Sequence, residues 1–306
     1  MEIRQLRALV AVADTGSVTK AAAHLHVVQP AVTKQIRMLE TELGVDLFER
    51  SRSGMRLNAS GRQVLERARR ALAELDRAAE DVRSAGGDIV GLVTVGLLPS
   101  AATLLAPLLV SAVADAHPGI RLRLSVGYAG HLAQWLEAGD VDVALLFEQP
   151  IAAAFEVRAL LLEDLWVVGP ASAELTAGEP ISLTDALSHP MILPNAPHGL
   201  RSIVDAAAAS VGQALSIPVE TNDSAVQLRL VEEGYGWTVL PSVLACAVGP
   251  ALSSAPVANP SLTRSIGTAT ARQPESSRAS IAVTQLLRET VAHAVTSGRW
   301  PSARLL

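Results

Sequence analysis

The sequence predicts an α/β protein with an N-terminal winged helix-turn-helix, a long linker helix and two α/β lobes. Three observations lead to this prediction: two helix patterns separated by a short turn within residues 15–43, an unbroken helix pattern from about residue 59 to 84, and alternating strand and helix patterns after residue 90. A chain of 306 residues has room for two or three domains, and a hydrophobic content of 49% is ample for their cores.

The N-terminal pattern is typical of three helices packed into a head. Residues 3–14 carry apolar side chains at helical spacing, and Gly16 can end that helix in the left-handed conformation. Ser17 can then cap a second helix, and after a short turn a third helix is expected to run to Leu43, where Gly44 stops it. The apolar face of the second helix consists of Val18, Ala21, Ala22 and Leu25.

The third helix has two faces of different chemistry. One face should be buried, because apolar residues recur on it at spacings of three and four: Val32, Ile36, Leu39 and Leu43. Gln29, Thr33 and Arg37 follow one another at four-residue spacing on another face, with Lys34 beside them. Donors and acceptors that point outward together from one helix suit the base edges of a DNA major groove.

A small hairpin, or wing, is expected after Gly44. Residues 47–50 and 55–57 read as two short strands joined by a turn at 53–54. Arginines crowd this hairpin at Arg50, Arg52 and Arg56. Beside a helix-turn-helix we interpret them as contacts to backbone phosphates or the minor groove, the alternative being an ordinary solvated loop.

A long helix over residues 59–84 carries one apolar seam on an otherwise charged surface, with Asn58 and Ser60 as possible caps. The seam repeats at spacings of three and four and consists of Leu65, Ala68, Leu72, Leu75, Ala79 and Val82. Such a seam either docks on its own head domain or pairs with a second copy of the chain. Because a helix of about 25 residues overhangs a head of about 60, we favour dimerisation.

Two adjacent glycines, Gly86 and Gly87, predict a hinge between this helix and the body. From Gly91 onward strands and helices alternate with short turns, which indicates βαβ units and a parallel sheet, and a second α/β segment begins near Val157. Ligands of such sheets bind at the carboxyl ends of strands, where the chain places Ser100, the loop 127–131 and Phe147. The sequence therefore predicts two lobes with a cleft between them.

Charge is distributed unevenly along the chain. Residues 1–86 contain 14 Lys and Arg against 11 Asp and Glu, whereas residues 87–306 contain 11 against 19, so only the head is basic although the formal net charge is −5. Phosphate contacts need cations only where a duplex lies, and this asymmetry favours a DNA-binding head on an acidic body.

Other composition features exclude several classes of protein. Cys246, the single cysteine, lies among apolar neighbours, so we expect it to be buried and unable to form an intramolecular disulfide. Neither a signal peptide nor an uninterrupted apolar run long enough for a bilayer is recognisable, and no zinc-ligand spacing accompanies His24 and His26. We therefore expect a cytoplasmic protein with no metal, no cofactor and no membrane partner.

With these residues the chain resembles the LysR-type transcriptional regulators over its whole length. The head carries the specific part of the resemblance: Ser17, Ala21-Ala22, Leu25, Gln29 to Thr33, Ile36, Leu39-Glu40, Leu43-Gly44, Leu47-Phe48, Arg50 and Gly61, all without a gap. It departs from the family pattern at Val28, where a serine that caps the recognition helix is common. Within this family the loop 127–131 faintly resembles that of regulators of nitrogen assimilation.

The resemblance implies a division of the chain into three parts. Residues 1–58 would form the winged helix-turn-helix, 59–86 the linker and dimerisation helix, and 87–306 an effector-binding domain. Its two Rossmann-like lobes would be of periplasmic-binding-protein type, with lobe I at about 90–156 and 267–306 and lobe II at about 157–266.

The resemblance also implies the residues of both sites. Those expected at the DNA are Ser17, Thr19, Lys20, Gln29, Pro30, Thr33, Lys34, Arg37, Arg50, Arg52 and Arg56. Those expected to touch a small-molecule effector are Ser100, Gly127, Tyr128, His131, Phe147, Asn195, His198, Arg201 and Asp223. Ser100 at a helix start suits an anionic effector, and His198 and Arg201 could add positive charge from the opposite lobe.

The resulting hypothesis is a transcriptional regulator, controlled by an anionic metabolite bound between the lobes. Its partners would be double-stranded DNA with an inverted-repeat site and a second or further copies of the chain, as a homodimer or homotetramer, with RNA polymerase as a further candidate. The alternatives are an enzyme, for which only His131 and Glu148 could be imagined as acid and base, and a plain solute-binding carrier. We expect no enzymatic activity, because no nucleophile elbow, phosphate loop or metal cluster is present in the sequence.

Overall fold

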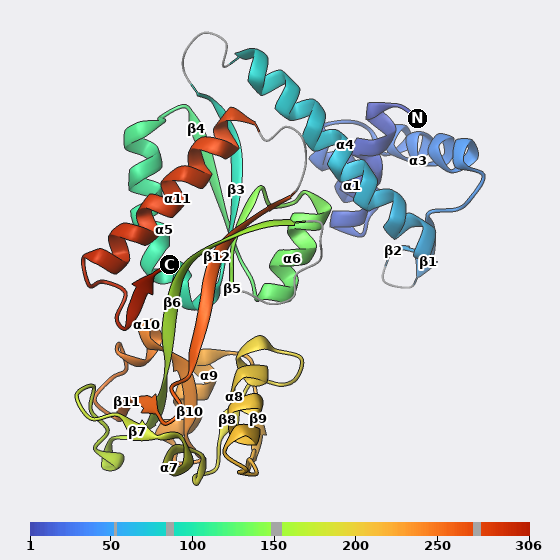
Figure 1. Cartoon of the computed structure of the whole chain (residues 1–306). Coiled ribbons are helices and arrows are strands. Elements are labelled where there is room, and N and C mark those ends of the chain that lie inside the picture. Colours follow the sequence, from blue (N-terminus) through green and yellow to red (C-terminus); the bar gives the residue numbers. More distant parts are fainter. Residues whose placement is uncertain (52–53, 84–88, 148–154, 272–276) are drawn as a thin grey trace.

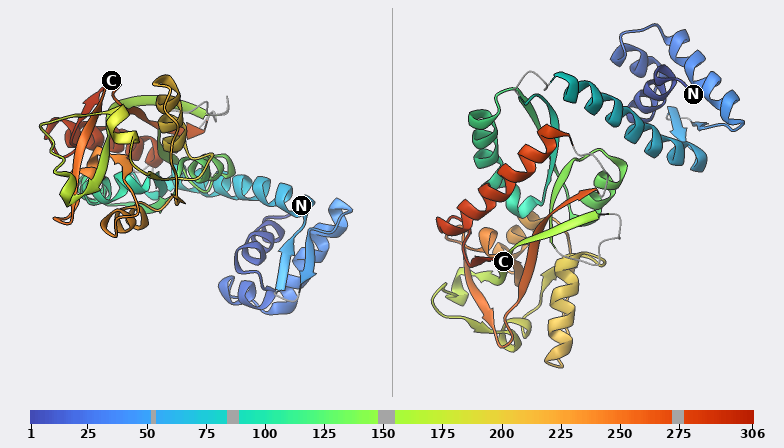
Figure 2. Two further views of the ribbon diagram at one scale, coloured as in Figure 1. Left: turned by 90° about the horizontal axis from the view of Figure 1, so that it is seen from below. Right: turned by 45° about the horizontal axis from the view of Figure 1, so that its top comes forward.

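The computed structural model describes residues 1–51, 54–83, 89–147, 155–271 and 277–306. A small head is joined through one long helix to a body of two lobes, as Figure 1 shows. In two further views the same helix remains the link between head and body (Figure 2). This arrangement confirms the predicted fold class.

The head contains helices α1 (Ile3–Thr15), α2 (Val18–His24) and α3 (Gln29–Leu43), followed by the wing strands β1 (Phe48–Ser51) and β2 (Gly54–Leu57). Gly16 adopts the left-handed conformation with φ 63° and donates its N–H to the Val12 carbonyl, which ends α1. Its own carbonyl accepts the Met55 N–H at 2.9 Å, so the turn between α1 and α2 also holds the wing.

The buried stripe of α3 is one residue shorter than predicted. Val32, Ile36 and Leu39 are buried, but Leu43 is 38% exposed, so its assignment to the core was wrong. Leu43 is the last residue of α3, where the chain turns away through the left-handed Gly44. Leu47, fully buried, fills the head core in its place.

Helix α4 (Ala59–Arg83) is preceded by Asn58, whose Oδ1 accepts the Gly61 N–H at 2.8 Å, as the expected cap requires. Gly61 lies so close to the wing that a Cβ there would stand 2.1 Å from the Leu47 carbonyl oxygen. The start of α4 is therefore packed tightly against the head.

This packing corrects part of the predicted dimer seam. Ala68 is 3% exposed within the head core, and Leu65 and Leu72 pack against the same core. The first half of the seam thus docks on its own head, because α1 and α4 lie side by side. Leu75 of the same seam is 47% exposed, whereas the side chains of Ala79 and Val82 and the hinge at Gly86 and Gly87 lie outside what the structure describes.

Lobe I is built from the predicted βαβ units, β3 (Gly91–Leu97), α5 (Pro99–Ala116), β4 (Ile120–Val126), α6 (Ala129–Ala138) and β5 (Val143–Phe147). Strand β3 pairs in parallel with β4 and β5, which confirms the predicted parallel sheet. Helices α5 and α11 (Arg278–Thr296) cover one face of this sheet and α6 the other (Figure 1). Among the described helices, α5 alone has the length and hydropathy of a membrane span, and Leu105 and Leu109 place it in the core of lobe I.

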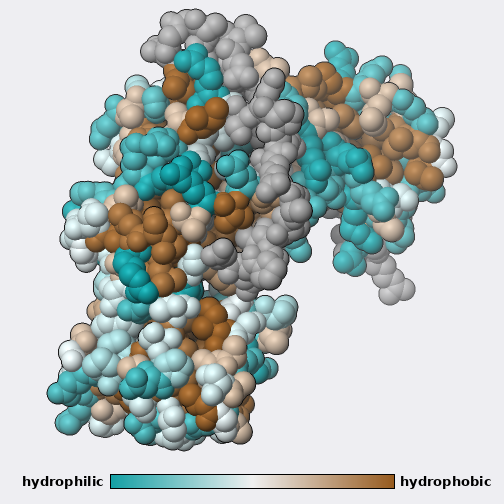
Figure 3. Space-filling model, in the orientation of Figure 1, coloured by the Kyte–Doolittle hydropathy of each residue, from teal (hydrophilic) through white to brown (hydrophobic). Residues whose placement is uncertain are grey.

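Two long strands run through both lobes. Strand β6 (Phe155–Pro170) pairs along its first part with β12 (Thr263–Ala271), which in turn pairs antiparallel with β5. The last residues of β6 pair antiparallel with β10 (Thr238–Pro241) and β11 (Leu252–Ala258) of lobe II. The lobes meet at a narrow waist in the space-filling view (Figure 3).

The rest of lobe II follows the second α/β segment that the sequence predicts. Its further elements are β7 (Ile181–Ser182), α7 (Leu183–Leu187), β8 (Ile192–Leu193), α8 (Gly199–Ser210), β9 (Val219–Glu220), α9 (Ser224–Glu232) and α10 (Ser242–Ala245). The C-terminal strand β13 (Ala303–Leu305) returns to pair with β6. Cys246 is exposed, against the expectation of burial, because it follows the last residue of the one-turn helix α10.

Candidate functional site

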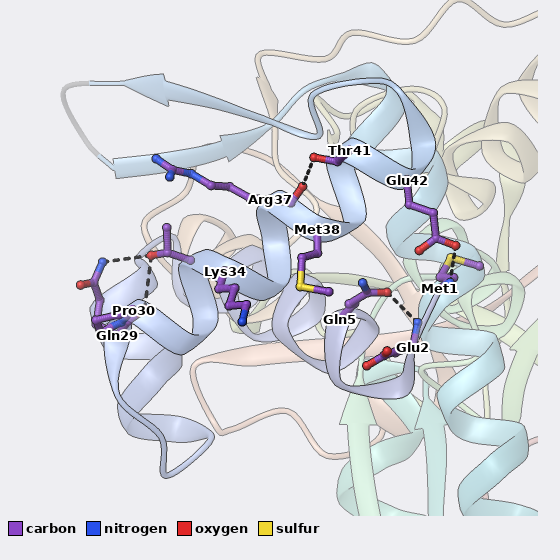
Figure 4. Close-up of a pocket in the computed structure, with 11 residues that line it drawn as sticks. Met1, Glu2, Gln5, Gln29, Pro30, Lys34, Arg37, Met38, Thr41 and Glu42 are labelled. Carbon is purple, nitrogen blue, oxygen red and sulfur yellow. Dashed lines mark hydrogen bonds and ion pairs between the residues drawn. The ribbon is translucent and has the colours of Figure 1, made fainter.

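The outward face of α3 carries the polar side chains that the sequence singles out. Gln29, Lys34 and Arg37 are exposed, and the Gln29 Nε2 donates to the Thr33 Oγ1 at 3.1 Å. The Thr33 hydroxyl donates in turn to the Gln29 carbonyl at 3.2 Å. The close-up in Figure 4 shows Gln29, Lys34 and Arg37 projecting from successive turns of this one helix.

The start of α3 offers few free backbone donors, because Pro30 has no N–H and the Ala31 N–H donates to the Val28 carbonyl at 2.9 Å. Val28 occupies the cap position and makes no side-chain cap hydrogen bond, as the departure from the family pattern predicts, and Pro30 lies in the first turn. The helix dipole still gives this end a partial positive charge, which favours a nearby phosphate oxygen. The N-terminal end of α3 is therefore suited to anion contact as well as to base contact.

A groove of about 790 Å³ separates α3 from the N-terminal end of α1. Its α3 wall includes Gln29, Pro30, Thr33, Lys34 and Arg37. The opposite end carries Glu42, which holds the N-terminal amine of Met1 (Figure 4). The cationic side chains thus lie toward one end of the groove and the carboxylates toward the other.

The other residues expected at the DNA surround α3. Ser17 caps α2 by accepting the Lys20 N–H, and Thr19 and Lys20 are exposed on that helix. Arg56 is exposed on β2, whereas the Arg50 side chain and all of Arg52 lie outside the described residues.

A second cavity, of about 50 Å³, lies between the lobes. Lobe I contributes the N-terminus of α5 and the ends of β4 and β5, and lobe II contributes the N-termini of α8 and α9. Four of the predicted effector residues line it, namely Ser100, Tyr128, Phe147 and His198. The remaining lining consists of Leu98, Pro99, Pro194, Leu200, Asn222, Ser224, Gln227, Leu240, Pro241, Leu244 and Arg264.

Arg264 on β12 is the charged site residue that the sequence interpretation missed. It is 7% exposed and forms a salt bridge with the fully buried Glu163 of β6 at 2.7 Å, while its Nη2 donates to the Ser100 Oγ at 2.9 Å. The Trp300 indole N–H donates to the other Glu163 oxygen at 2.9 Å. A signal was present, since each charge lies two residues from a buried leucine or isoleucine on either side, and residues two apart in a strand share one face.

Tyr128 joins the two lobes across the cavity. Its hydroxyl on lobe I donates to the Asn222 carbonyl on lobe II, and its ring meets the His198 ring edge-on at 5.4 Å. Burial, and secondarily the nearby Asp223 carboxylate, raise the pKa of the Tyr128 phenol, so it remains a donor. We call this pair of contacts the Tyr128 latch.

The positive charges expected from lobe II are absent from the cavity. Burial, followed by the neighbouring Arg264 guanidinium, lowers the pKa of His198, so its imidazole is neutral near pH 7. The His198 Nδ1 accepts the Leu200 N–H, which leaves the ring proton on Nε2. Arg201 is held by Asp205 and Glu220 outside the cavity lining. The expectation that both supply free positive charge was wrong.

The other predicted effector residues have structural partners or face solvent. Asp223 caps α9 by accepting the Ala225 and Val226 N–H groups, and Asn195 is exposed. His131 is exposed and stacks on Trp135, which also backs Gly127. Glu148 lies outside the described residues, and within the described ranges no group of three or more possible metal ligands occurs.

Two family models match the chain. The model described as bacterial regulatory helix-turn-helix protein, lysR family, covers residues 3–62, and the LysR substrate binding domain model covers residues 86–292. The first contains the α3 face and the second contains the inter-lobe cavity.

Proteins similar to most of the chain are regulators by name. The HTH-type transcriptional regulator TfdS of Cupriavidus pinatubonensis is 34% identical over 255 residues, which are 82% of this chain and 85% of that protein. BbuR of Bordetella bronchiseptica, also an HTH-type transcriptional regulator, is 30% identical over 75% of this chain and 70% of its own length. The nitrogen assimilation regulatory protein nac of Klebsiella aerogenes is 29% identical over 87% of both chains.

Solved structures share the fold at full length. CbnR in complex with its target DNA has a TM-score of 0.72 at 26% identity, over 95% of this chain and all of that chain. Full-length BenM has a TM-score of 0.60 at 25% identity, over 99% of both chains.

Proposed function

Because the chain belongs to the LysR family of DNA-binding transcriptional regulators, we propose that α3 reads an operator in the major groove under the control of an effector bound between the lobes. Members of this family are transcriptional regulators and not enzymes, so the enzyme alternative is excluded. The observation that carries the proposal is the exposed face of α3, where Gln29, Thr33, Lys34 and Arg37 project together.

Each of these side chains has a role that fits its chemistry. Gln29 pairs with an adenine edge, Thr33 contacts a base or a thymine methyl, and Lys34 and Arg37 reach guanine or phosphate. Arg56 on the wing holds the register through the backbone. The structure of CbnR with its target DNA supports this arrangement, since that protein shares the fold of this chain.

Pairing of two heads would place two α3 helices on one duplex. The exposed Leu75 of the α4 seam supplies surface for a second copy. A two-fold dimer reads an inverted repeat, with half-sites about one helical turn or a multiple of it apart. We propose a homodimer or homotetramer that acts in the cytoplasm, with RNA polymerase as a further partner.

Control would come from the cleft between the lobes. The strands β6 and β12 run through both lobes, and the Tyr128 latch holds the two lobes together. A ligand that favours one separation of the lobes shifts the population toward that state. The body would then change how two heads sit on the operator.

The test is selection of genomic DNA fragments by the full-length protein. The wild type is compared with a Gln29→Ala, Thr33→Ala double variant, and with Thr41→Ala as a control near the other end of α3. Losing base contacts costs about 1–3 kcal/mol of discrimination per contact, so the double variant should keep only weak, salt-sensitive binding. Equal sequence selection by the wild type and the double variant would disprove the α3 assignment.

A further inference from the structure

Among the described residues that line the inter-lobe cavity, Arg264 is the one with a charged side chain. We propose that it binds the carboxylate of a small apolar monocarboxylate, which takes the place that Ser100 now occupies on the guanidinium. This inference rests on the proposed function, because it names the chemical class of the effector and the residue that selects it.

The guanidinium has donors left for a ligand. Its Nε and Nη2 point at one oxygen of Glu163, with Nε at 2.8 Å, and Nη2 also reaches the Ser100 hydroxyl. Nη1 makes no hydrogen bond with any part of the chain that the structure describes. Since guanidinium offers five N–H groups in a planar fork, two of them at Nη1 remain for a carboxylate oxygen.

Glu163 fixes Arg264 rather than competing for the ligand. It is fully buried, and its second oxygen is occupied by Trp300. A buried carboxylate that holds one edge of a guanidinium leaves the opposite edge oriented for a second acceptor. Arg264 is thus positioned before the ligand arrives.

The start of α5 adds a second source of positive potential. Leu98, in the cap position, provides no side-chain acceptor, and Pro99 and Ser100 form the first turn of an 18-residue helix beside the cavity. In contrast, the starts of α8 and α9 are capped by His198 and Asp223. An oxyanion between Arg264 and Ser100 would receive both the guanidinium and the helix N-terminus.

The rest of the lining selects for one charge and an apolar body. Leu98, Phe147 and Leu200 supply apolar surface, and the His198 ring is neutral. A second carboxylate on the ligand would be buried with no cation to pair with it, which is strongly unfavourable. The site should therefore reject dicarboxylates as well as uncharged analogues.

The size of the cavity connects binding to movement. A cavity of about 50 Å³ is small beside ligand pockets of roughly 300–1,000 Å³, so a carboxylate group with an apolar body needs more room than the lobes leave in this structure. An apolar body attached to that group must push the lobes apart and break the Tyr128 latch. The ligand would consequently set the separation of the lobes.

The experiment uses a matched series of four-carbon compounds on the full-length protein. Butyrate, butyramide and succinate are titrated by calorimetry at neutral pH into the wild type, Arg264→Gln, and the Glu163→Gln, Arg264→Gln double variant. The double variant removes both buried charges and so guards against misfolding caused by an unpaired Glu163. Arg201→Gln is the control, since Arg201 is held by carboxylates outside the cavity lining.

We expect the wild type to bind butyrate at least about tenfold more tightly than butyramide, which loses a charge-assisted hydrogen bond, or succinate, whose second carboxylate would be buried unpaired. Both Arg264 variants should lose this preference, while Arg201→Gln keeps it. Butyrate binding by the double variant at wild-type strength, equal binding of butyramide, or no butyrate binding by the wild type would overturn the inference. Operator selection is measured separately, so a wild type that selects DNA but ignores butyrate refutes the ligand class and leaves the proposed function standing.

Discussion

The Arg69 guanidinium on α4 donates a 2.8 Å hydrogen bond to the Asp140 carboxylate at the end of α6, and so ties the linker helix to lobe I. The same guanidinium pairs with Asp14 of the head. Burial is the main cause that raises the pKa of Asp140, and the Arg69 charge opposes it. One side chain therefore connects head, linker and body.

Replacing Arg69 with Ala should loosen the head relative to the body without unfolding either. The pairs are partly exposed, so we expect a loss of only about 0.2–1 kcal/mol in unfolding free energy. Energy transfer between dyes on the head and lobe I should report a broader distance distribution. Arg67→Ala is the control, because Arg67 is exposed on the same helix, and an equal broadening in both variants would contradict the idea.

The wing arginine Arg56 should contribute to affinity and not to sequence choice. We expect Arg56→Ala to weaken binding to all DNA sequences and to lower the slope of log affinity against log salt by about 0.9, the value for one phosphate contact. The measurement is a salt titration of operator and random DNA. Arg121→Ala, an exposed change on β4 in the body, should leave the slope unchanged, and a change in sequence preference with Arg56→Ala would show base contact instead.

Leu75 should matter for association of two chains. Leu75→Glu places a charge at an exposed position of the α4 seam, so we expect a higher dimer dissociation constant with a folded head, as measured by sedimentation and circular dichroism. Gln63→Glu adds the same charge at an exposed position on a different face of α4 and is the control. A dimer that persists unchanged in Leu75→Glu would locate the interface elsewhere.

His198 should make folding sensitive to mild acid. Its pKa is lowered in the folded state, so below about pH 6.5 the unfolded chain takes up a proton that the folded chain refuses. The contribution of the neutral ring is thus complete above that pH and is lost as the pH falls toward the folded-state pKa. Urea unfolding at pH 7.5 and 5.5 should show a larger loss for the wild type than for His198→Gln.

His24→Gln, a change at an exposed position on α2, controls for the effect of the substitution itself. It should lose as much stability on acidification as the wild type does. If His198→Gln also follows the wild type, burial of the neutral His198 ring does not contribute to the pH dependence.

The head could be predicted from sequence because its signals are local. Gly16 and Ser17 end one helix and begin the next within two residues, and the apolar spacing fixes which face is buried. The error at Leu43 arose at a helix end, where the backbone turns out of the helical pattern. The seam on α4 was misjudged for a different reason: periodicity shows that a face is apolar but does not say which surface covers it.

The inter-lobe site was only half predictable. Ser100 and Phe147 follow from the rule that parallel strands present ligands at their carboxyl ends. The Arg264 pair with Glu163 joins residues 101 positions apart, which neither spacing nor periodicity can connect. Arg201 was misassigned because its partners Asp205 and Glu220 become neighbours only when α8 and β9 come together.

The order of strands in the large sheet has a consequence for synthesis of the protein. Strand β12 lies between β5 and β6, yet it follows all of lobe II in the chain, and α11 comes later still. While the ribosome is still making lobe II, lobe I has an open sheet edge and lacks one covering helix. The nascent chain can therefore present a finished DNA-reading head long before it has a body able to respond to a ligand.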